Sequence, residues 1–318
     1  MLGIRAKARY AWGMNLAPTH LVYGEPPRDL ASVPMGAVQC SPLMPGSVRT
    51  SDFPNGSVAS GIVYAPPATI ERRYVLARML NALAVGAPLT ALAPKDKGGS
   101  RLAHDLERFG CSVHDEPRRH HRIVTATRPA VLIGIDDAIT AGSFQQHPAH
   151  GLWTHPGVFS WDRLDAGSAL LLTHLPELSG SGADLGAGIG VLSRSILASS
   201  HIRALTLIDN DRRAIGAATR NINDPRAQSV WADIRDAHGL PMGLDFVVMN
   251  PPFHDAGIED HSLGHAFIQR AASLLKSGGV CWLVANRHLP YEALLAKCFS
   301  RTRVVTNEAG FKIFESVK

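Results

Sequence analysis

Apolar stretches alternate with amphipathic stretches over the second half of the chain. The runs "ALTLID" and "LDFVVMN" have the length and composition of buried strands, whereas "DRRAIGAATRNI" and "HSLGHAFIQRAASLL" repeat apolar residues at helical spacing. Alternating strands and helices predict βαβ units and a parallel sheet that is covered on both faces. The closing stretch "RTRVVTNEAGFKIFESV" has two strand-like pieces around Ala309 and Gly310, which predicts an antiparallel hairpin.

The first half of the chain has a weaker pattern. Its first 60 residues are rich in Gly, Pro and Ser, and the alternation returns only near residue 68. There "IERRYVLARMLNAL" and "GSRLAHDLERF" predict helices, while "PLTALA" and "RIVTAT" predict strands. From about residue 129 to residue 155 there is little periodicity, so we expect a linker. The sequence therefore predicts two domains, residues 1–150 (with the linker beginning at about 129) and residues 151–318.

Two segments about 185 residues apart share one order of features. "IVYAPPATIERRYVLARMLNAL" and "VVMNPPFHDAGIEDHSLGHAFIQRAASLL" each have an apolar strand, a Pro-Pro turn and an amphipathic helix, and each continues into a further strand. The first copy has Ala65 at the position of Asn250 and Ala68 at the position of Phe253. This order predicts a duplicated fold whose first copy has lost its chemistry, with two unrelated Pro-Pro turns as the alternative.

The composition is that of a folded protein. Of the 318 residues, 45% are apolar and 19% are charged, and no apolar run approaches the roughly 18 residues needed to cross a bilayer. The basic start "MLGIRAKARYAWGMNLAP" lacks the apolar core of a secretory signal. The four cysteines are scattered without a C-x-x-C pair, which favours reduced thiols and no metal site. We therefore expect a cytoplasmic protein with no membrane partner.

The net charge of +5 is unevenly distributed along the chain. Residues 1–150 carry 16 Lys and Arg against 11 Asp and Glu, whereas residues 151–318 carry 16 of each. A basic excess in one half favours a polyanionic partner for that half, and a chance asymmetry of solvated surfaces is the alternative. Nothing in this pattern indicates an oligomeric state.

The stretch "ADLGAGIGVLS" has a glycine at every second position after a strand end. Asp184 lies at the strand end, and Gly186, Gly188 and Gly190 let the backbone turn sharply and approach a ligand. A dinucleotide-binding loop needs G-x-G-x-x-G, but the third position of that spacing is Val191. The spacing D-x-G-x-G-x-G is instead the form found in class I S-adenosylmethionine methyltransferases, although a purely structural turn is the alternative.

Two further strands end close to acidic residues. "LTLIDND" ends on Asp209, which can accept hydrogen bonds from both ribose hydroxyls, and Asn210 follows it; Asp209 could also cap the next helix. "VWADIRDA" offers Asp233 as a partner for an adenine amino group. Three acidic strand ends in this order favour a site for an adenosine-containing cofactor, so we include Asn210 among the residues expected to bind it.

The stretch "VVMNPPFHDAG" combines an amide, a rigid turn and an aromatic ring. The Asn250 side-chain oxygen and the Pro251 carbonyl can each accept one hydrogen of an exocyclic amine, so that its nitrogen lone pair is directed at a methyl donor. Pro251 and Pro252 fix φ and hold these acceptors in place, and Phe253 offers a face on which a base can stack. A helix-capping Asn with a Pro turn is the alternative, but it leaves Phe253 unexplained.

Together "DLGAGIG", "LIDND", "NPPFHDAG" and "PGVFSWDRLDAGSALLL" resemble the bacterial small-subunit ribosomal RNA guanine-N2 methyltransferases. The resemblance covers about residues 154–318. It implies a Rossmann-like class I methyltransferase fold after a degenerate methyltransferase-like domain that supports catalysis and RNA binding. It also implies an S-adenosylmethionine cofactor and a ribosomal RNA partner.

The resemblance also assigns roles to particular residues. Asp184 and the three glycines would line the cofactor, Asp209 would hold its ribose, and Asn250 to Phe253 would hold the target amine, with His254 beside them. Phe159 and Ser160 would lie near the reaction centre. Ala187 departs from the family, which often has Cys there.

Other functions remain open from the sequence. "NPPF" also occurs in enzymes that methylate adenine N6 or a protein glutamine, and large-subunit guanine-N2 enzymes share much of the longer pattern. Transfer RNA is a further possible target. A scaffold that binds S-adenosylmethionine or RNA without catalysis is the non-enzymatic alternative.

Overall fold

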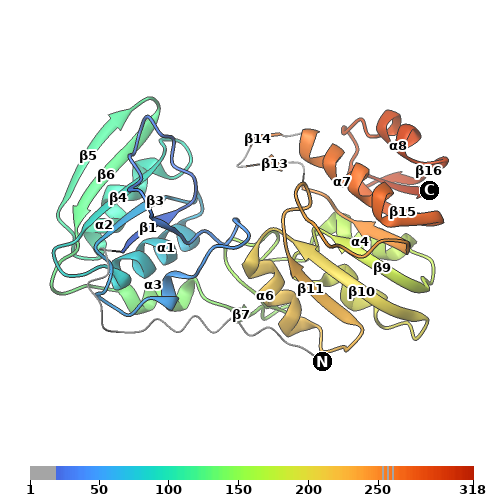
Figure 1. The fold of residues 1–318 in the computed structure, drawn as a ribbon, viewed down its shortest axis with the longest axis horizontal. Coiled ribbons are helices and arrows are strands. Elements are labelled where there is room, and N and C mark those ends of the chain that lie inside the picture. Colours follow the sequence, from blue (N-terminus) through green and yellow to red (C-terminus); the bar gives the residue numbers. More distant parts are fainter. Residues whose placement is uncertain (1–18, 253, 256–257, 260) are drawn as a thin grey trace.

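Two separate mixed sheets, each with helices packed on it, form the framework of the protein (Figure 1). The structure is a computed structural model that describes residues 19–252, 254–255, 258–259 and 261–318, without the side chains of 254, 255, 258, 259 and 261. The first sheet lies in the half coloured blue to green, and the second in the half coloured yellow to red.

The second sheet has the order β11-β10-β9-β12-β15-β17-β16. Strands β11, β10, β9, β12 and β15 pair in parallel, whereas β17 pairs antiparallel with both β15 and β16. The predicted parallel sheet with a C-terminal hairpin is therefore confirmed. Its strands are β9 (Gly180–Leu185), β10 (Ile202–Asp209), β11 (Ala227–Trp231), β12 (Leu244–Met249), β15 (Leu275–Asn286), β16 (Arg301–Glu308) and β17 (Phe311–Val317).

Helices cover both faces of this sheet because successive residues of its central strand point to opposite sides. Phe246 and Val248 pack on one face with residues of α4, α5 and α6, whereas Val247 and Met249 pack on the other with residues of α7 and α8. The helices are α4 (Ala166–His174), α5 (Val191–Ile196), α6 (Arg212–Asn221), α7 (His261–Leu274) and α8 (Glu292–Cys298). A short hairpin, β13 (His254–Asp255) and β14 (Ile258–Glu259), precedes α7.

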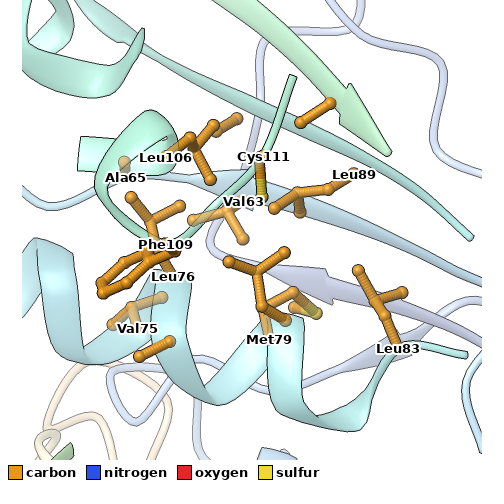
Figure 2. Packing of buried hydrophobic residues seen from close by; sticks show 14 of the residues in the cluster. Val63, Ala65, Val75, Leu76, Met79, Leu83, Leu89, Leu106, Phe109 and Cys111 are labelled. Atoms are coloured by element: carbon orange, nitrogen blue, oxygen red, sulfur yellow. The ribbon is translucent and has the colours of Figure 1, made fainter. Parts of the chain in front are cut away.

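The first sheet has the order β2-β1-β3-β4-β6-β5. Strands β2 to β4 are parallel and β5 and β6 form an antiparallel hairpin beside β4. One face packs on α1, α2 and α3 around Val63, Leu76, Met79 and Phe109 (Figure 2). Its elements are β1 (His20–Tyr23), β2 (Val38–Gln39), β3 (Ser60–Tyr64), α1 (Thr69–Ala82), β4 (Pro88–Pro94), α2 (Leu102–Arg108), β5 (Val113–Arg118), β6 (His121–Thr127) and α3 (Ile135–Ala141), with single 3₁₀ turns at Thr50–Asp52 and Gly99–Arg101.

The six strands of the first sheet repeat the order of six of the seven strands of the second, which confirms the predicted duplication. When β3 is matched to β12 through their Pro-Pro turns, β1, β2, β4, β6 and β5 fall on β9, β10, β15, β17 and β16. In this register Tyr23 of the first sheet takes the place of Asp184, because Tyr23 pairs with Val63 and Asp184 pairs with Val248. The first copy has no helix between β1 and β2, where the second has α5.

The segment predicted as a linker contains structure. Helix α3 packs against α1, and Ile135 is buried in the core of the first domain. Residues 135–141 therefore belong to that domain, and only the stretch around the short hairpin of β7 (Gln145–Gln146) and β8 (Trp153–Thr154) connects the two halves. The helix is only two turns long and carries Asp136 and Asp137 in its first turn, so its apolar periodicity is too brief to stand out.

The two domains contact each other through a loop and α1 of the first domain and through α6 and β11 of the second. The Pro42 carbonyl accepts hydrogen bonds from the Arg212 backbone (2.9 Å) and the Trp231 indole (3.2 Å). Buried Arg213 pairs with Glu71 of α1 at 2.5 Å and with Asp211 at 2.8 Å. A buried guanidinium held by a carboxylate from each domain is costly to separate, so this contact fixes the domains relative to each other.

Among the described residues, no helix combines the length and apolar character that crossing a membrane requires. The same part of the chain brings no three His, Cys, Asp or Glu side chains together in the manner of a metal site. All four cysteines are free thiols, as their scattered positions predicted.

Candidate active site

A pocket of about 270 Å³ lies at the carboxyl ends of β9, β10 and β12. Loops from neighbouring parallel strands meet at this edge of a sheet, which is where ligands of such folds bind. Of the residues predicted to bind a cofactor, all except Asp184 and Gly190 lie in its wall. The wall includes Gly186, Gly188, Asp209, Asn210, Asp233, Ile234, Asn250, Pro251, Pro252, Leu263 and Phe267.

The glycine loop turns through three left-handed positions between β9 and α5. Gly186, Gly188 and Gly190 have φ angles of +72°, +54° and +86°, a conformation that side chains rarely adopt. A Cβ atom at Gly188 would meet nothing within 4 Å, so the loop backbone is open to the pocket there. A Cβ atom at Gly190 would meet the Ile222 side chain at 2.9 Å. Gly190 thus allows close packing at the end of α6, outside the pocket wall.

Asp209 is held at the end of β10 by two backbone donors. The N–H of Gly188 and the N–H of Asp211 each donate to one of its carboxylate oxygens, at 2.8 Å. Each oxygen keeps a further lone pair that can accept a ligand hydroxyl. Burial raises the pKa of Asp209 to about 6, against the lowering effect of the two backbone bonds. Near pH 7 the carboxyl is therefore mainly ionised and able to accept hydrogen bonds.

Asp184 has a different environment from the other predicted cofactor residues. It is fully buried beneath the glycine loop, where one carboxylate oxygen accepts a hydrogen bond from the Ser193 hydroxyl at 2.6 Å. The other oxygen has no partner among the described residues. Burial raises the pKa of Asp184 to about 7. This carboxyl therefore links β9 to α5 through a hydrogen bond and lies outside the pocket wall.

Asn210 and Asp233 also line the pocket. The Asp233 carboxylate is paired with Arg235 at 2.6 Å, and this hydrogen-bonded pairing lowers the pKa of Asp233. Asn210 is exposed, and its carbonyl accepts the Trp231 indole N–H at 2.9 Å. Both residues line the pocket, and the Asp233 carboxylate is already engaged by Arg235.

Asn250 is fixed in one orientation by two residues of the segment before β9. Its amide nitrogen donates to the Asp165 carboxylate at 2.7 Å and to the Ser168 hydroxyl at 3.0 Å. A carboxylate only accepts, so Asn250 must turn its NH₂ toward Asp165. Its side-chain oxygen is then left as an acceptor at the pocket wall. Asp165 also caps α4 by accepting the Ser168 N–H at 2.7 Å, which holds the anchor itself in place.

Phe159 and Ser160 line a small cavity together with Asn250. This second cavity of about 40 Å³ adjoins the main pocket and is also lined by Asp165 among others. Phe159 also lines the main pocket and is 61% exposed. Phe253 lies outside the described residues, as does the side chain of His254, so their predicted contacts with substrate stay predictions.

Sequence reasoning missed two contributions to the site. Asp165 and Ser168 lie in the "LDAGS" stretch that supported the resemblance, but their contact with Asn250 crosses 82 and more residues of chain. Leu43 lines the main pocket although it belongs to the first domain. It is brought there by the contacts of Pro42 with Arg212 and Trp231, which no local pattern indicates.

Comparisons with known proteins identify the family of this chain. Residues 149–315 match the family model of the methyltransferase small domain. The chain is 31% identical over 315 residues to the ribosomal RNA small subunit methyltransferase C of Pseudomonas paraeruginosa, covering 94% of both chains. It is 32% identical over 273 residues to the protein of that name from Pseudomonas syringae, covering 83% of this chain and 81% of the other.

A solved structure shares the fold over nearly the whole length. It is the 16S rRNA N2 G1207 methyltransferase of T. thermophilus in complex with AdoMet and guanosine, with a TM-score of 0.77 and 22% sequence identity. The alignment covers 96% of this chain and 90% of that one, so both domains are shared. By its sequence similarity over both domains, this chain belongs to the ribosomal RNA small subunit methyltransferase C family.

Proposed function

We propose that the protein transfers a methyl group from S-adenosylmethionine to the exocyclic N2 amine of a guanine in small-subunit (16S) ribosomal RNA. The observation that carries this proposal is the orientation of Asn250. Asp165 and Ser168 occupy its NH₂ group, so its oxygen is presented at the pocket shared with the glycine loop and Asp209. The relatives named as ribosomal RNA small subunit methyltransferases support the choice of RNA.

The described residues fit S-adenosylmethionine. Both Asp209 oxygens have a lone pair free for the ribose hydroxyls, and the backbone at Gly188 is open to close approach. Ile208, Ile234 and Leu263 add apolar surface to the wall. The pocket of about 270 Å³ is near the lower end of the range for small-molecule sites, roughly 300–1,000 Å³. When bound, this cofactor supplies an electrophilic methyl group.

The residues around Asn250 suit the acceptance of a planar amine. The Asn250 oxygen takes one amine hydrogen and the Pro251 carbonyl takes the other, which favours a pyramidal nitrogen with a directed lone pair. As the new N–C bond forms and the methyl–sulfur bond breaks, the amine becomes positively charged. It then loses one proton to water, so no general base is needed before transfer. Alignment by a rigid turn is the main contribution of the protein.

The rival functions make different predictions for substrates. A protein glutamine target requires no RNA affinity, and adenine N6 leaves a different modified nucleoside. A large-subunit or transfer RNA target keeps the chemistry but changes the RNA. A scaffold would bind S-adenosylmethionine or RNA and transfer nothing.

The test is nucleoside mass spectrometry of ribosomal RNA from cells with and without the protein. We expect N2-methylguanosine to be absent at one position of the small-subunit RNA when the protein is missing. The purified protein with methyl-labelled S-adenosylmethionine should restore the mark, on naked RNA or on the assembled particle. Label in large-subunit or transfer RNA, in N6-methyladenosine or in a protein would identify a rival, and no label in any substrate would leave the scaffold.

A further inference from the structure

A separate cavity of about 270 Å³ lies between the domains and is lined by five arginines. Arg49 and Arg78 come from the first domain, and α6 of the second domain contributes Arg212, Arg213 and Arg220. No Asp or Glu appears among the described residues of its lining. Such a concentration of guanidinium groups is unfavourable unless anions compensate it.

Carboxylates neutralise only one of the five. Arg213 is paired with Glu71 and Asp211. Arg212 donates to the carbonyls of Ser47 and Val48, which are uncharged. None of Arg49, Arg78, Arg212 and Arg220 forms an ion pair with a carboxylate in the described part of the chain. Asp52, which is exposed, accepts the backbone N–H of Arg49 at 2.8 Å and forms no ion pair with the guanidinium of this described residue.

One of these arginines, Arg78, has a buried donor atom without a hydrogen-bond partner among the described residues. This atom is Nε, and the guanidinium lies 5.5 Å from the centre of the Tyr74 ring. A buried donor without a partner costs about 1–3 kcal/mol. Burial, and then repulsion from Arg49, lower the pKa of Arg212, as expected for a like-charged cluster. The cluster is therefore suited to an anion with several acceptor oxygens.

The position of the cavity indicates which anion this is. Leu43 and Asp211 line the main pocket, while their neighbours Pro42 and Arg212 line the arginine cavity, so the two cavities lie on opposite sides of one contact between the domains. Arg49 and Arg220 are exposed, which places the rim of the cavity in solvent. The rings of Tyr74 and Phe144 add flat apolar surface. A charged, partly aromatic cavity next to the active site is suited to a nucleotide chain.

We propose that the arginine cavity binds a backbone phosphate of the RNA substrate, close to the nucleotide that is methylated. This inference rests on the proposed function. Guanidinium groups match phosphate oxygens in bidentate geometry, and Arg49 and Arg78 have no carboxylate to displace. A phosphate held here would set the register of the RNA across both domains, while the recognition of the base stays in the main pocket.

The test compares the double variant Arg49→Gln/Arg78→Gln with wild type and with Arg301→Gln. Arg301 is an exposed arginine on the outer strand β16 and lines neither the main pocket nor the arginine cavity. The affinity for a labelled transcript of small-subunit ribosomal RNA is measured at several salt concentrations. Each lost phosphate contact should reduce the slope of log affinity against log salt by about 0.7–1 and the affinity at 0.1 M salt by roughly fivefold.

The expected result is an RNA affinity reduced some 10- to 30-fold with a flatter salt slope in the double variant, and no change in Arg301→Gln. Unchanged S-adenosylmethionine affinity shows that the double variant is folded. If the double variant does not fold, the single variant Arg49→Gln is tested instead, because the Arg49 side chain is exposed. RNA affinity and slope equal to those of Arg301→Gln would overturn the inference. The inference would also be overturned if inorganic phosphate stabilised the wild type but not the double variant while the RNA affinity of the two proteins was the same. Wild-type protein that methylates no RNA would refute the proposed function instead.

Discussion

The two Pro-Pro turns of the molecule have the same place in two similar sheets but opposite chemistry. In the first copy, the Arg72 guanidinium donates a hydrogen bond to the Pro67 carbonyl at 2.7 Å, and Arg72 is itself buried and paired with Asp105. In the second copy, the corresponding turn carries Asn250, whose NH₂ is held by Asp165 and Ser168. The first turn has Ala65 where the second has Asn250, so only the second turn places a side-chain oxygen at a pocket wall. The turn is therefore a structural element that becomes a site only when it carries such an acceptor.

The ends of the first strands differ in the same manner. In the first copy, the Gln39 side chain bonds both the N–H and the carbonyl of Gly24, at 3.0 Å and 2.9 Å, and closes the end of β1. In the second copy, the backbone of the glycine loop is held from one side by Asp209 and stays open at Gly188. Duplication thus preserved the sheet, and the first copy filled its ligand positions with its own side chains.

Replacing Asn250 by Ala gives the second turn the residue of the first, Ala65, and has the largest expected effect. Removing the side-chain acceptor should lower the rate of methyl transfer by about 10²–10³-fold or more. Because Asn250 is one of many residues in the pocket wall, the Kd of S-adenosylmethionine should change little. Transfer assays with calorimetry check this, and a joint loss of activity and cofactor affinity would show that the residue is structural.

Replacing Asp209 by Ala removes the acceptor that β10 contributes and the first copy lacks. Two charge-assisted hydrogen bonds are lost, so we expect the Kd of S-adenosylmethionine to rise about 100-fold. The pKa of about 6 adds a pH dependence in the wild type: as pH falls through 6, the carboxyl takes up a proton and the affinity decreases. Titration calorimetry between pH 5 and 8 measures both effects. An Ala variant with wild-type affinity would remove Asp209 from the cofactor site.

Replacing Asp165 by Ala tests whether the anchor of Asn250 matters. The amide would be free to rotate, and we expect the rate of transfer at saturating substrates to fall about tenfold while the cofactor Kd is kept. The variant also loses a helix cap worth about 1 kcal/mol, so Asp165→Asn is the matched control. An Asn side chain can still cap α4 and accept from Asn250, and it should retain most of the activity. Equal rates in both variants would assign Asp165 to stability alone.

Much of the second domain could be predicted from sequence because its signals are local. Strand periodicity, the glycine spacing and the acidic residue after "LTLI" all lie within short windows, and the structure puts Gly186, Gly188, Asp209 and Asn250 around one pocket. The contributions of Asp165 and Leu43 depend on contacts between segments far apart in the chain, for which no window carries a signal.

The first domain was harder to interpret for a related reason. Between β1 and β2 a loop with Pro26, Pro27 and Pro34 takes the place of a helix, and it covers the outer face of the sheet through Leu30 and a few neighbours. Such a loop has no periodicity. Helix α3 was missed because it is short, although it completes the core around α1. The resemblance assigned Asp184 to the cofactor, and the structure adds what no local pattern carries: its carboxyl is buried, bonded to Ser193, and outside the pocket wall.

Of the substitutions considered, the one at Asp184 has the smallest expected effect on the protein. Tyr23 takes the place of Asp184 in the first sheet, so the two residues can be compared directly. The folded-state pKa of about 7 lies above the ordinary value of 3.8, so the fold favours the protonated form of the Asp184 carboxyl. Stability from this group is complete below pH 4 and is lost as pH rises toward 7, where ionisation in the buried site becomes costly. Tyr23 is neutral throughout this range, because burial raises its pKa above the ordinary value of 10.

The substitution Asp184→Asn makes the second sheet resemble the first in this respect. Its amide oxygen can still accept the Ser193 hydroxyl, and it has no charge to bury. We therefore expect the melting temperature of the variant relative to wild type to increase between pH 4 and pH 7 and to stay a few degrees higher above pH 7. Since Asp184 lies outside the pocket wall, the Kd of S-adenosylmethionine should stay within about twofold of wild type. A constant difference in melting temperature across this range would mean that Asp184 is ionised in the fold, and a weakened cofactor would mean that its carboxylate reaches the ligand after all.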